Sequence, residues 1–314
     1  MLGSSIFLDW KTWAIGMWIA ATHFYFPTPS PNLASQFDAL IETFSSSLSP
    51  LATLLNLNLD KLIWATTNVA LLEISFWSTI LLFYLFDHLK LFPKYKLHEG
   101  TPDPKMVREC LTDVLLGHLL VRPILLYFSM PLFANDGWLL GSNIPNFLTI
   151  MKQLFCCIMV DDTVFYWVHR GFHHSAIYKH IHKQHHAFKA PIALATEYSH
   201  PIEDFSNTLA TVLGPLLMGS HSIVFYLYTT LKLVQSLDAH SSYNLPFSPF
   251  SIIETMDCAP AHDFHHTHNT GNFGGWFIFW DWLCGTDQRY SLHLEKNKTN
   301  PAYFNVTKSV KQAL

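Results

Sequence analysis

Histidines are concentrated in one short part of this 314-residue chain. Seven of its 19 histidines lie between His169 and His186. A histidine, two other residues and a histidine pair occur in order at His182-Lys-Gln-His185-His186, and again at His262-Asp-Phe-His265-His266. Because residues three and four apart share one face of a helix, each pattern predicts a helix that presents several imidazoles in one direction. Neutral imidazole binds iron, zinc, copper and nickel, so converging groups indicate more than one metal ion.

Histidines also occur in proteins without binding metal. A lone histidine is usually a satisfied polar residue, and we keep that interpretation for six isolated ones: His23, His88, His98, His118, His221 and His293. A histidine-rich tract can also be a disordered metal-buffering run. Here Phe165, Tyr166, Trp167, Phe172 and Tyr178 are interleaved with the histidines, which is not a disordered composition. Histidines at helical spacing beside an apolar segment are also difficult to explain as core filling.

The composition indicates an integral membrane protein. Hydrophobic residues make up 50% of the chain and charged residues only 13%, whereas a soluble domain carries about 25% charged residues. The net charge of −4 provides no basic field, so we expect no nucleic-acid partner. The five cysteines have no spacing typical of metal or redox sites and are expected to be reduced thiols.

Four apolar segments predict transmembrane helices, because a crossing needs about 20 residues. They are residues 13–26, 63–86, 111–133 (interrupted at Arg122-Pro123) and 147–167. Residues 45–50 are expected to form a turn-rich connector, and 90–108 a polar loop whose lysines and arginine favour the cytosolic side. The chain then returns to the cytosol before His169. Residues 209–237 predict a re-entrant or interfacial helical hairpin broken at Gly214-Pro215.

The expected fold is an all-α integral membrane protein with about four transmembrane helices and a histidine-rich helical catalytic region on the cytosolic side. We expect residues 1–150 to be mainly transmembrane helices and connecting loops. Residues 151–290 are expected to be the catalytic domain, and residues 291–314 a polar C-terminal tail.

A metal centre with histidine ligands, no cysteine and few carboxylates suits non-haem iron if two ions together activate O2. No side chain is basic enough to remove a proton from the alkyl group of a lipid, so the metal must carry the difficult step. The apolar substrate would enter from the bilayer and the reductant would arrive from the cytosol. The His-Glu-x-x-His pattern of zinc proteases, a glycine-rich phosphate loop and a Gly-x-Ser-x-Gly elbow are all absent from the sequence.

Several segments carry a resemblance to one superfamily. Residues 161–186 read Asp-Asp-x-x-Phe-Tyr-Trp-x-His-Arg-x-x-His-His and then Tyr-Lys-x-Ile-His-Lys-x-His-His. This pattern resembles the fatty acid hydroxylase/sterol desaturase superfamily. Further segments are similar to its methylsterol monooxygenase branch, the sterol C4-methyl oxidases: 190–191, 197–203, 237–241, 262–266, 271–273 and 280–287. The resemblance covers about residues 150–290, and the combination of three histidine boxes is specific.

The resemblance implies a multi-pass enzyme of the endoplasmic reticulum membrane whose catalytic site faces the cytosol. It implies two iron ions in a non-haem diiron centre. It also implies O2 and NAD(P)H-derived electrons as co-substrates, with cytochrome b5 and its reductase as partners. Because His200-Pro201 is not followed by two glycines, a fused cytochrome b5 domain is not indicated, and the electrons must come from a separate protein.

The resemblance also implies the ligands. The box ligands are His169, His173, His182, His185, His186, His262, His265 and His266. His174 can replace or supplement His173, because the spacing of the family's first box varies. His240 corresponds to a further ligand, and His200 is a candidate that stays open. Three carboxylates, Asp238, Glu203 and Asp263, are expected to orient imidazoles, although Asp263 can equally be a helix-start carboxylate.

The leading functional hypothesis is the oxidation of an alkyl group of a sterol, most specifically a C4 methyl. The alternatives within the superfamily are sterol desaturation, sterol side-chain oxidation, and fatty acyl or aldehyde chemistry. A non-enzymatic metal carrier is a further alternative, but a carrier needs a polar path across the bilayer, whereas these histidines gather at one side. One departure concerns the backbone, because Ser242 stands where family members often have glycine.

Overall fold

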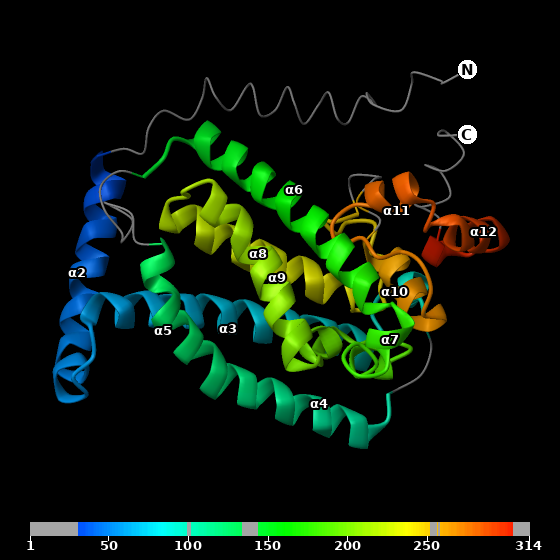
Figure 1. Ribbon diagram of the computed structural model, residues 1–314, viewed down its shortest axis with the longest axis horizontal. Helices are drawn as coiled ribbons and strands as arrows, with labels where there is room; N and C mark the ends of the chain where they lie inside the picture. The colour runs from blue at the N-terminus through cyan, green and yellow to red at the C-terminus, as the bar shows by residue number, and fades with distance from the viewer. Residues whose placement is uncertain (1–30, 99–101, 134–143, 252–255, 257, 304–314) are drawn as a thin grey trace.

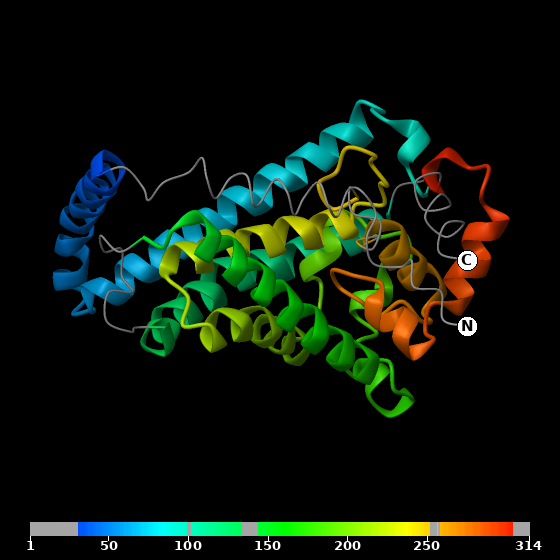
Figure 2. The same cartoon turned by 90° about the horizontal axis from the view of Figure 1, so that it is seen from above.

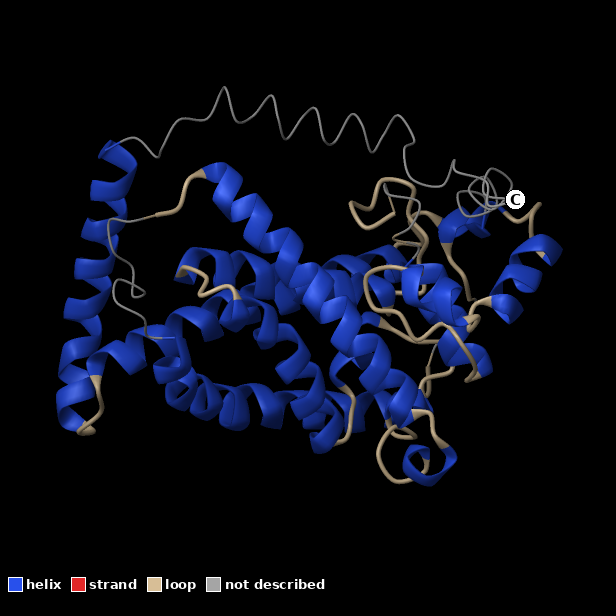
Figure 3. Cartoon of the chain, turned by 45° about the horizontal axis from the view of Figure 1, so that its top comes forward, coloured by secondary structure: helices blue, strands red, loops and turns tan. Residues whose placement is uncertain are grey.

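The computed structural model describes residues 31–98, 102–133, 144–251, 256 and 258–303. The described residues are mostly helical and contain no β-strand, which confirms the predicted all-α class for this part of the chain. The long helices occupy one end of the molecule, while short helices and loops gather at the other end (Figures 1 and 3). The apolar segment at 13–26, predicted as the first span, lies outside the described residues.

The helices follow one another with mostly short connections. The α-helices and the π-helical stretch η2 are α2 (Pro31–Leu54), α3 (Leu59–His88), α4 (Pro104–Leu116), η2 (Gly117–Val121), α5 (Arg122–Phe133), α6 (Phe147–Phe172), α7 (Ser175–Tyr178), α8 (Pro201–Leu217), α9 (Ser222–Ala239), α10 (Cys258–His268), α11 (Phe279–Cys284) and α12 (Gln288–Lys296). The short 3-10 helices are η1 (Pro93–Tyr95), η3 (His185–Ala187), η4 (Ala193–Glu197) and η5 (Pro301–Tyr303).

Two helices in the described part of the chain are long and apolar enough to cross a membrane. They are α3 and the continuous helix Pro104–Phe133 formed by α4, η2 and α5. Large apolar side chains such as Ile74, Leu119 and Phe128 are exposed along them, as lipid-facing residues would be. The second helix begins seven residues before the predicted 111, so the expected polar loop 90–108 is wrong beyond Asp103. Helix formation starts there because the Asp103 carboxylate accepts the backbone N–H of Lys105 at 2.9 Å and Pro104 suits the first helical position.

The predicted turn-rich connector at 45–50 is also wrong, because α2 runs through it. The hydroxyls of Ser46 and Ser47 donate to the carbonyl oxygen of Thr43, at 2.8 and 2.9 Å. These bonds satisfy the serine side chains inside the helix and remove the main reason for serine to favour a turn. Figure 2 shows α2 at the end of the molecule that lies opposite α12.

A partly buried ionic cluster joins α3, α5 and η4. Arg122 donates to Glu73 at 3.0 Å and to Glu197 at 2.7 Å. The ring of His118, in η2, lies between the same two carboxylates, at 2.9 Å from Glu73 and 2.6 Å from Glu197. This cluster explains how Glu73 is tolerated in an apolar helix, because a buried charge needs paired and hydrogen-bonded neighbours. The helix continues through Arg122-Pro123, where the sequence predicted an interruption.

Helices α8 and α9 form the predicted hairpin, but its break lies at 218–221 and not at Gly214-Pro215. Gly219 ends α8 with a φ of 53°, and the His221 ring caps α9 by accepting the N–H of Ile223 at 3.2 Å. Gly214 is needed for another reason. A Cβ atom at this position would lie 2.7 Å from the Cα of Cys157, so α8 packs directly on the backbone of α6.

Helix α6, where the sequence predicted a fourth span, is not one of the two candidate membrane helices. It carries two fully buried acids near its middle, Asp161 and Asp162. Asp161 pairs with the buried Lys232 of α9 at 3.1 Å, and Asp162 accepts the backbone N–H groups of Trp276 and Phe277 at 2.8 and 3.1 Å. Helix α6 is therefore attached to α9 and to the loop that follows α10.

We predict that Gly214→Ala separates α8 from α6. The added methyl group overlaps the Cys157 backbone, which cannot move as a side chain can, and such overpacking costs about 1–3 kcal/mol. The detergent-solubilised variant should therefore unfold at a lower temperature than the parent. Gly117→Ala is the matched control, because no atom lies within 4 Å of its added methyl group. Equal melting temperatures for the Gly214 variant and the parent would contradict the close packing.

Candidate metal centre

Nine histidines from distant parts of the chain converge in two adjoining groups. The five-histidine group contains His169, His173, His182, His186 and His265. The four-histidine group contains His185, His240, His262 and His266. Within each group the ligand nitrogens all lie within 4.8 Å of one another. All nine side chains are buried except that of His173, which is partly exposed.

Four segments supply these side chains. The end of α6 carries His169 and its C-cap is His173, while His240 is the C-cap of α9. The second box forms turns and the 3-10 helix η3 instead of the predicted α-helix, although the His186 N–H still donates to the His182 carbonyl oxygen at 3.3 Å. The third box lies in α10, as predicted.

The second and third boxes each contribute to both groups, which the spacing of the histidines did not predict. In the second box, His182 and His186 enter the five-histidine group, and His185 enters the four-histidine group. In the third box the assignment is reversed, since His265 enters the five-histidine group while its two neighbours enter the other: His262 and His266. In each box, the two histidines that are four residues apart enter the same group. The histidine between them enters the other group. The two groups touch where the rings of His186 and His266 stack with centroids 4.6 Å apart.

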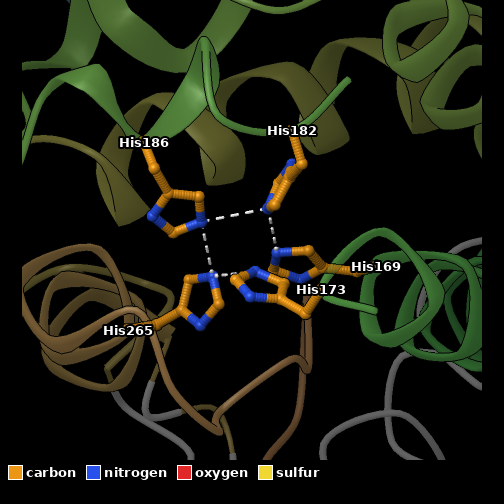
Figure 4. A group of neighbouring side chains, drawn as sticks. All are labelled: His169, His173, His182, His186 and His265. Atoms are coloured by element: carbon orange, nitrogen blue, oxygen red, sulfur yellow. Dashed lines mark hydrogen bonds between the residues drawn. The ribbon is translucent and has the colours of Figure 1, made fainter. Parts of the chain in front are cut away.

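The Nε2 atoms face one another inside each group. Figure 4 shows the five-histidine group, with Nε2–Nε2 separations of 3.1 Å between His169 and His182 and 3.0 Å between His182 and His186. His265 lies 3.1 Å from both His186 and His173 by the same measure. In the four-histidine group the successive separations are 3.0–3.2 Å.

The opposite ring nitrogen, Nδ1, faces an acceptor in five of the nine histidines. His169 faces the Phe273 carbonyl oxygen at 2.9 Å, and His182 faces a Glu203 carboxylate oxygen at 2.8 Å. The other three also face carbonyl oxygens: His240 that of Ser236, His265 that of Gly271 and His266 that of Phe188. Because these acceptors need a donor, the proton belongs on Nδ1, and each Nε2 carries a lone pair that points into its group.

This arrangement fits metal ions. Lone pairs facing one another at about 3 Å repel, and a cation between them removes the repulsion. Fixing Nδ1–H on a carbonyl or carboxylate is the usual way in which proteins orient histidine ligands. Burial lowers the pKa of His186 to about 3, with the neighbouring imidazoles as a further cause, and it lowers the pKa of His262, His265 and His266 well below the ordinary value. The imidazoles are therefore neutral, the form that binds metals.

Two candidate ligands predicted from the sequence lie outside both groups. His174 is the N-cap of α7, and its Nδ1 accepts the N–H of Ala176 at 3.4 Å. His200 is the N-cap of α8, and its Nδ1 accepts the N–H of Ile202 at 3.2 Å. Each ring accepts a backbone N–H group that has no partner within its own helix, at the start of that helix. This placement favours a structural role for both histidines. The structure brings His173, and not His174, to the centre.

The three predicted orienting carboxylates differ in what they contact. Glu203 is buried and bonds the clustered His182, as expected. Asp263 lies in the middle of α10 and not at its start; it faces the Nε2 of the isolated His98 at 2.6 Å. Asp238 accepts the hydroxyl of Ser248 at 3.2 Å. Asp263 and Asp238 thus hold loops near the centre.

The loop 271–277 supports the centre in a way that the histidine boxes do not reveal. It supplies the carbonyl oxygens of Gly271 and Phe273 to two clustered histidines. Its own N–H groups are held by Asp281, which accepts from Phe273 and Gly274 at 2.8 Å each. Gly271 has a φ of 63°, and a Cβ there would overlap the carbonyl oxygen of Thr286. In the sequence, the glycines and the aspartate within 271–281 are the features that could have predicted this tightly held loop.

Ser242 keeps the backbone conformation that glycine favours. Its φ is 57°, which lies in the left-handed region that glycine adopts without strain. The single hydroxyl proton is shared between two acceptors, the Pro191 carbonyl oxygen at 2.8 Å and an Asp263 carboxylate oxygen at 2.9 Å from Oγ. These bonds offset the strain of a left-handed serine and connect the segment after His240 to α10.

Comparisons with known proteins agree with this site. The sequence model of the family described as Fatty acid hydroxylase matches residues 154–286. The chain is 33% identical over 209 residues to the very-long-chain aldehyde decarbonylase GL1-11 of Oryza sativa subsp. indica, covering 66% of this chain and 79% of that protein. It is 32% identical over 220 residues to methylsterol monooxygenase 1 of Rattus norvegicus, covering 68% and 74%. It is 31% identical over 219 residues to the putative methylsterol monooxygenase DDB_G0269788 of Dictyostelium discoideum, covering 69% and 81%. No solved structure matches the chain.

Fold and site together define a helical protein with candidate membrane helices and two histidine groups that could each hold a metal ion. The chain belongs to the fatty acid hydroxylase family. It is an enzyme of the oxidoreductase class, as its relatives are. The resemblance to methylsterol monooxygenases predicted from the boxes is confirmed, and the similarity extends equally to aldehyde decarbonylases.

We predict that Glu203→Gln weakens metal binding at the five-histidine group. The amide is a weaker partner than the carboxyl group for the Nδ1–H of His182, and loss of such a partner typically costs about 10–100-fold in metal affinity. Competition with a chelator on purified protein measures this change. Asp204→Asn is the matched control, because Asp204 is the exposed neighbour on the same helix turn. Unchanged affinity in the Glu203 variant would refute the orienting role.

Proposed function

We propose that this protein is a membrane-bound non-haem diiron oxygenase that oxidises an alkyl group of a sterol, at a C4 methyl, with O2 and electrons from reduced cytochrome b5. The observation that carries the proposal is the pair of adjoining, buried, inward-facing imidazole groups. Two iron ions bound there would supply the activation of O2. The ligands are the nine grouped histidines, and residues 151–290 form the catalytic domain.

The protein's own residues prepare the centre for this chemistry. Carbonyl oxygens and Glu203 fix the imidazoles before metal arrives, so little reorganisation is needed. Burial excludes water from eight of the nine side chains, which protects a reactive centre from side reactions. The neighbouring apolar helices give a lipid access from the bilayer, since α3 and Pro104–Phe133 expose apolar side chains.

The proposed topology is about four crossings of the endoplasmic reticulum membrane, with the centre on the cytosolic side. The two candidate membrane helices, α6, and residues 13–26 would make these crossings. Exposed Lys179, Lys183 and Lys189 beside the centre support the cytosolic orientation, since cytosolic segments carry an excess of lysine and arginine.

A second substrate class is supported by a specific observation. The rice relatives named as very-long-chain aldehyde decarbonylases are 33–34% identical to the chain, against 31–32% for the methylsterol monooxygenases. The histidine boxes specify the metal centre and not the pocket, so the same centre serves either substrate. Chemistry on a long-chain aldehyde, as the names of these relatives state, is therefore the alternative to sterol oxidation.

Two adjacent histidines provide a sharp test of the centre. We predict that His173→Ala holds fewer than two iron ions per chain and loses turnover, because its Nε2 lies 3.1 Å from that of His265. His174→Ala should keep both ions and its turnover, because its ring only caps α7. Iron analysis of the purified variants decides this. Equal iron loss in both, or loss only in the His174 variant, would overturn the assignment.

The reaction itself is tested with the purified, iron-loaded protein, cytochrome b5, its reductase and NADPH. We predict substrate-dependent O2 uptake with a 4-methyl sterol and a 4-hydroxymethyl product by mass spectrometry. His185→Ala should abolish turnover while the protein still inserts into membranes, because His185 belongs to the four-histidine group. Product formation from a long-chain aldehyde but not from the sterol would select the alternative. Absence of O2 uptake with both substrates would refute the proposed function.

A further inference from the structure

The segment that supplies five of the grouped histidines also presents a basic surface. We define this surface by four exposed residues, Arg170, Lys179, Lys183 and Lys189. Two of these cations, Arg170 and Lys183, directly follow the grouped histidines His169 and His182 in the sequence. Lys179 directly follows Tyr178, whose ring lies beside the five-histidine group. None of the four forms an ion pair within the part of the chain that the structure describes.

The segment that carries these cations is positively charged, although the whole chain is not. Residues 163–196 contain no aspartate or glutamate, while the net charge of the chain is −4. Exposed Asp113 of α4 borders the segment, where its carboxylate accepts from Gln184 at 3.3 Å. The positive charge is therefore local to the segment that covers the histidines, and it lacks internal partners that would neutralise it.

The same segment contains the grouped histidine that is most accessible to solvent. His173 is the one grouped histidine that is partly exposed. The ring of Tyr178, also partly exposed, lies with its centroid 5.5 Å from that of His173, 6.1 Å from His182 and 5.9 Å from His186. The partly exposed Tyr178 ring is thus in contact with rings of the five-histidine group.

We propose that the basic surface is the docking site of a small acidic one-electron redox protein. This inference rests on the proposed function and assigns the face at which its electrons enter. Hydroxylation of one C–H bond takes one O2, two electrons and two protons and releases one water. Two reduced donors must therefore dock in turn, each losing one electron, with the protons coming from solvent. Complementary charge raises the rate of such encounters and makes them sensitive to salt.

The test is a charge reversal at three lysines: Lys179→Glu, Lys183→Glu and Lys189→Glu in one variant. Arg170 is left in place because it also donates to Tyr166 at 3.2 Å. Holoenzyme in nanodiscs of neutral lipid is titrated with oxidised cytochrome b5 at low and at moderate salt, which measures binding without turnover. We expect the triple variant to bind about tenfold or more weaker at low salt and to lose the salt dependence.

Turnover measurements then separate docking from catalysis. With reduced cytochrome b5 the triple variant should show a donor KM about tenfold higher, and with dithionite it should match the parent. The control variant makes the same charge change at exposed lysines outside the segment, by Lys90→Glu, Lys94→Glu and Lys296→Glu. It should bind the donor as the parent does.

The remaining outcomes overturn the inference in distinguishable ways. Parental binding, KM and salt dependence in the triple variant would remove the basic surface as the docking site and leave the proposed function intact. A defect that arises only in nanodiscs with anionic lipid would assign the cations to lipid headgroups. A parent protein that turns over with neither cytochrome b5 nor dithionite would refute the proposed function itself.

Discussion

The centre depends on one constraint, which is that each imidazole must turn its Nε2 lone pair inward. A buried neutral histidine can carry its proton on either nitrogen, and the choice is made by the partner of Nδ1. For five of the nine histidines this partner is fixed, by the carbonyl oxygens of Phe273, Gly271, Phe188 and Ser236 and by the Glu203 carboxyl group. The ligand geometry therefore follows from the path of the backbone around the centre, and the loops there must be held rigidly.

Much of the surrounding structure holds that backbone in place. Asp281 and Asp162 accept the N–H groups of loop 271–277, and the Lys232–Asp161 pair links α9 to α6 behind it. From the opposite direction, the ionic cluster of Glu73 and Arg122 ties η4 to the candidate membrane helices through Glu197. Charged residues that look unfavourable in an apolar chain thus connect the loops of the site to the long helices.

The sequence predicts the helical class and the residues of the site, but not how those residues are arranged. The boxes, together with the family resemblance at His240, identify all nine grouped histidines, because imidazoles at box spacing are unusual and carry a recognisable chemistry. The pattern could not show that His185 and His186 face different groups, since this depends on a turn and a 3-10 helix where the spacing suggested an α-helix. The pattern also could not show which of His173 and His174 joins the centre. The two are adjacent residues of the same type, and only the structure shows that His174 is the N-cap of α7.

The interleaving of the boxes has a consequence for how the centre tolerates change. His185 and His186 are consecutive on one short 3-10 helix, yet they belong to different groups, and α10 divides its histidines in the same way. A substitution that shifts the backbone of η3 or of α10 therefore displaces histidines of both groups, so the two groups cannot be altered independently there.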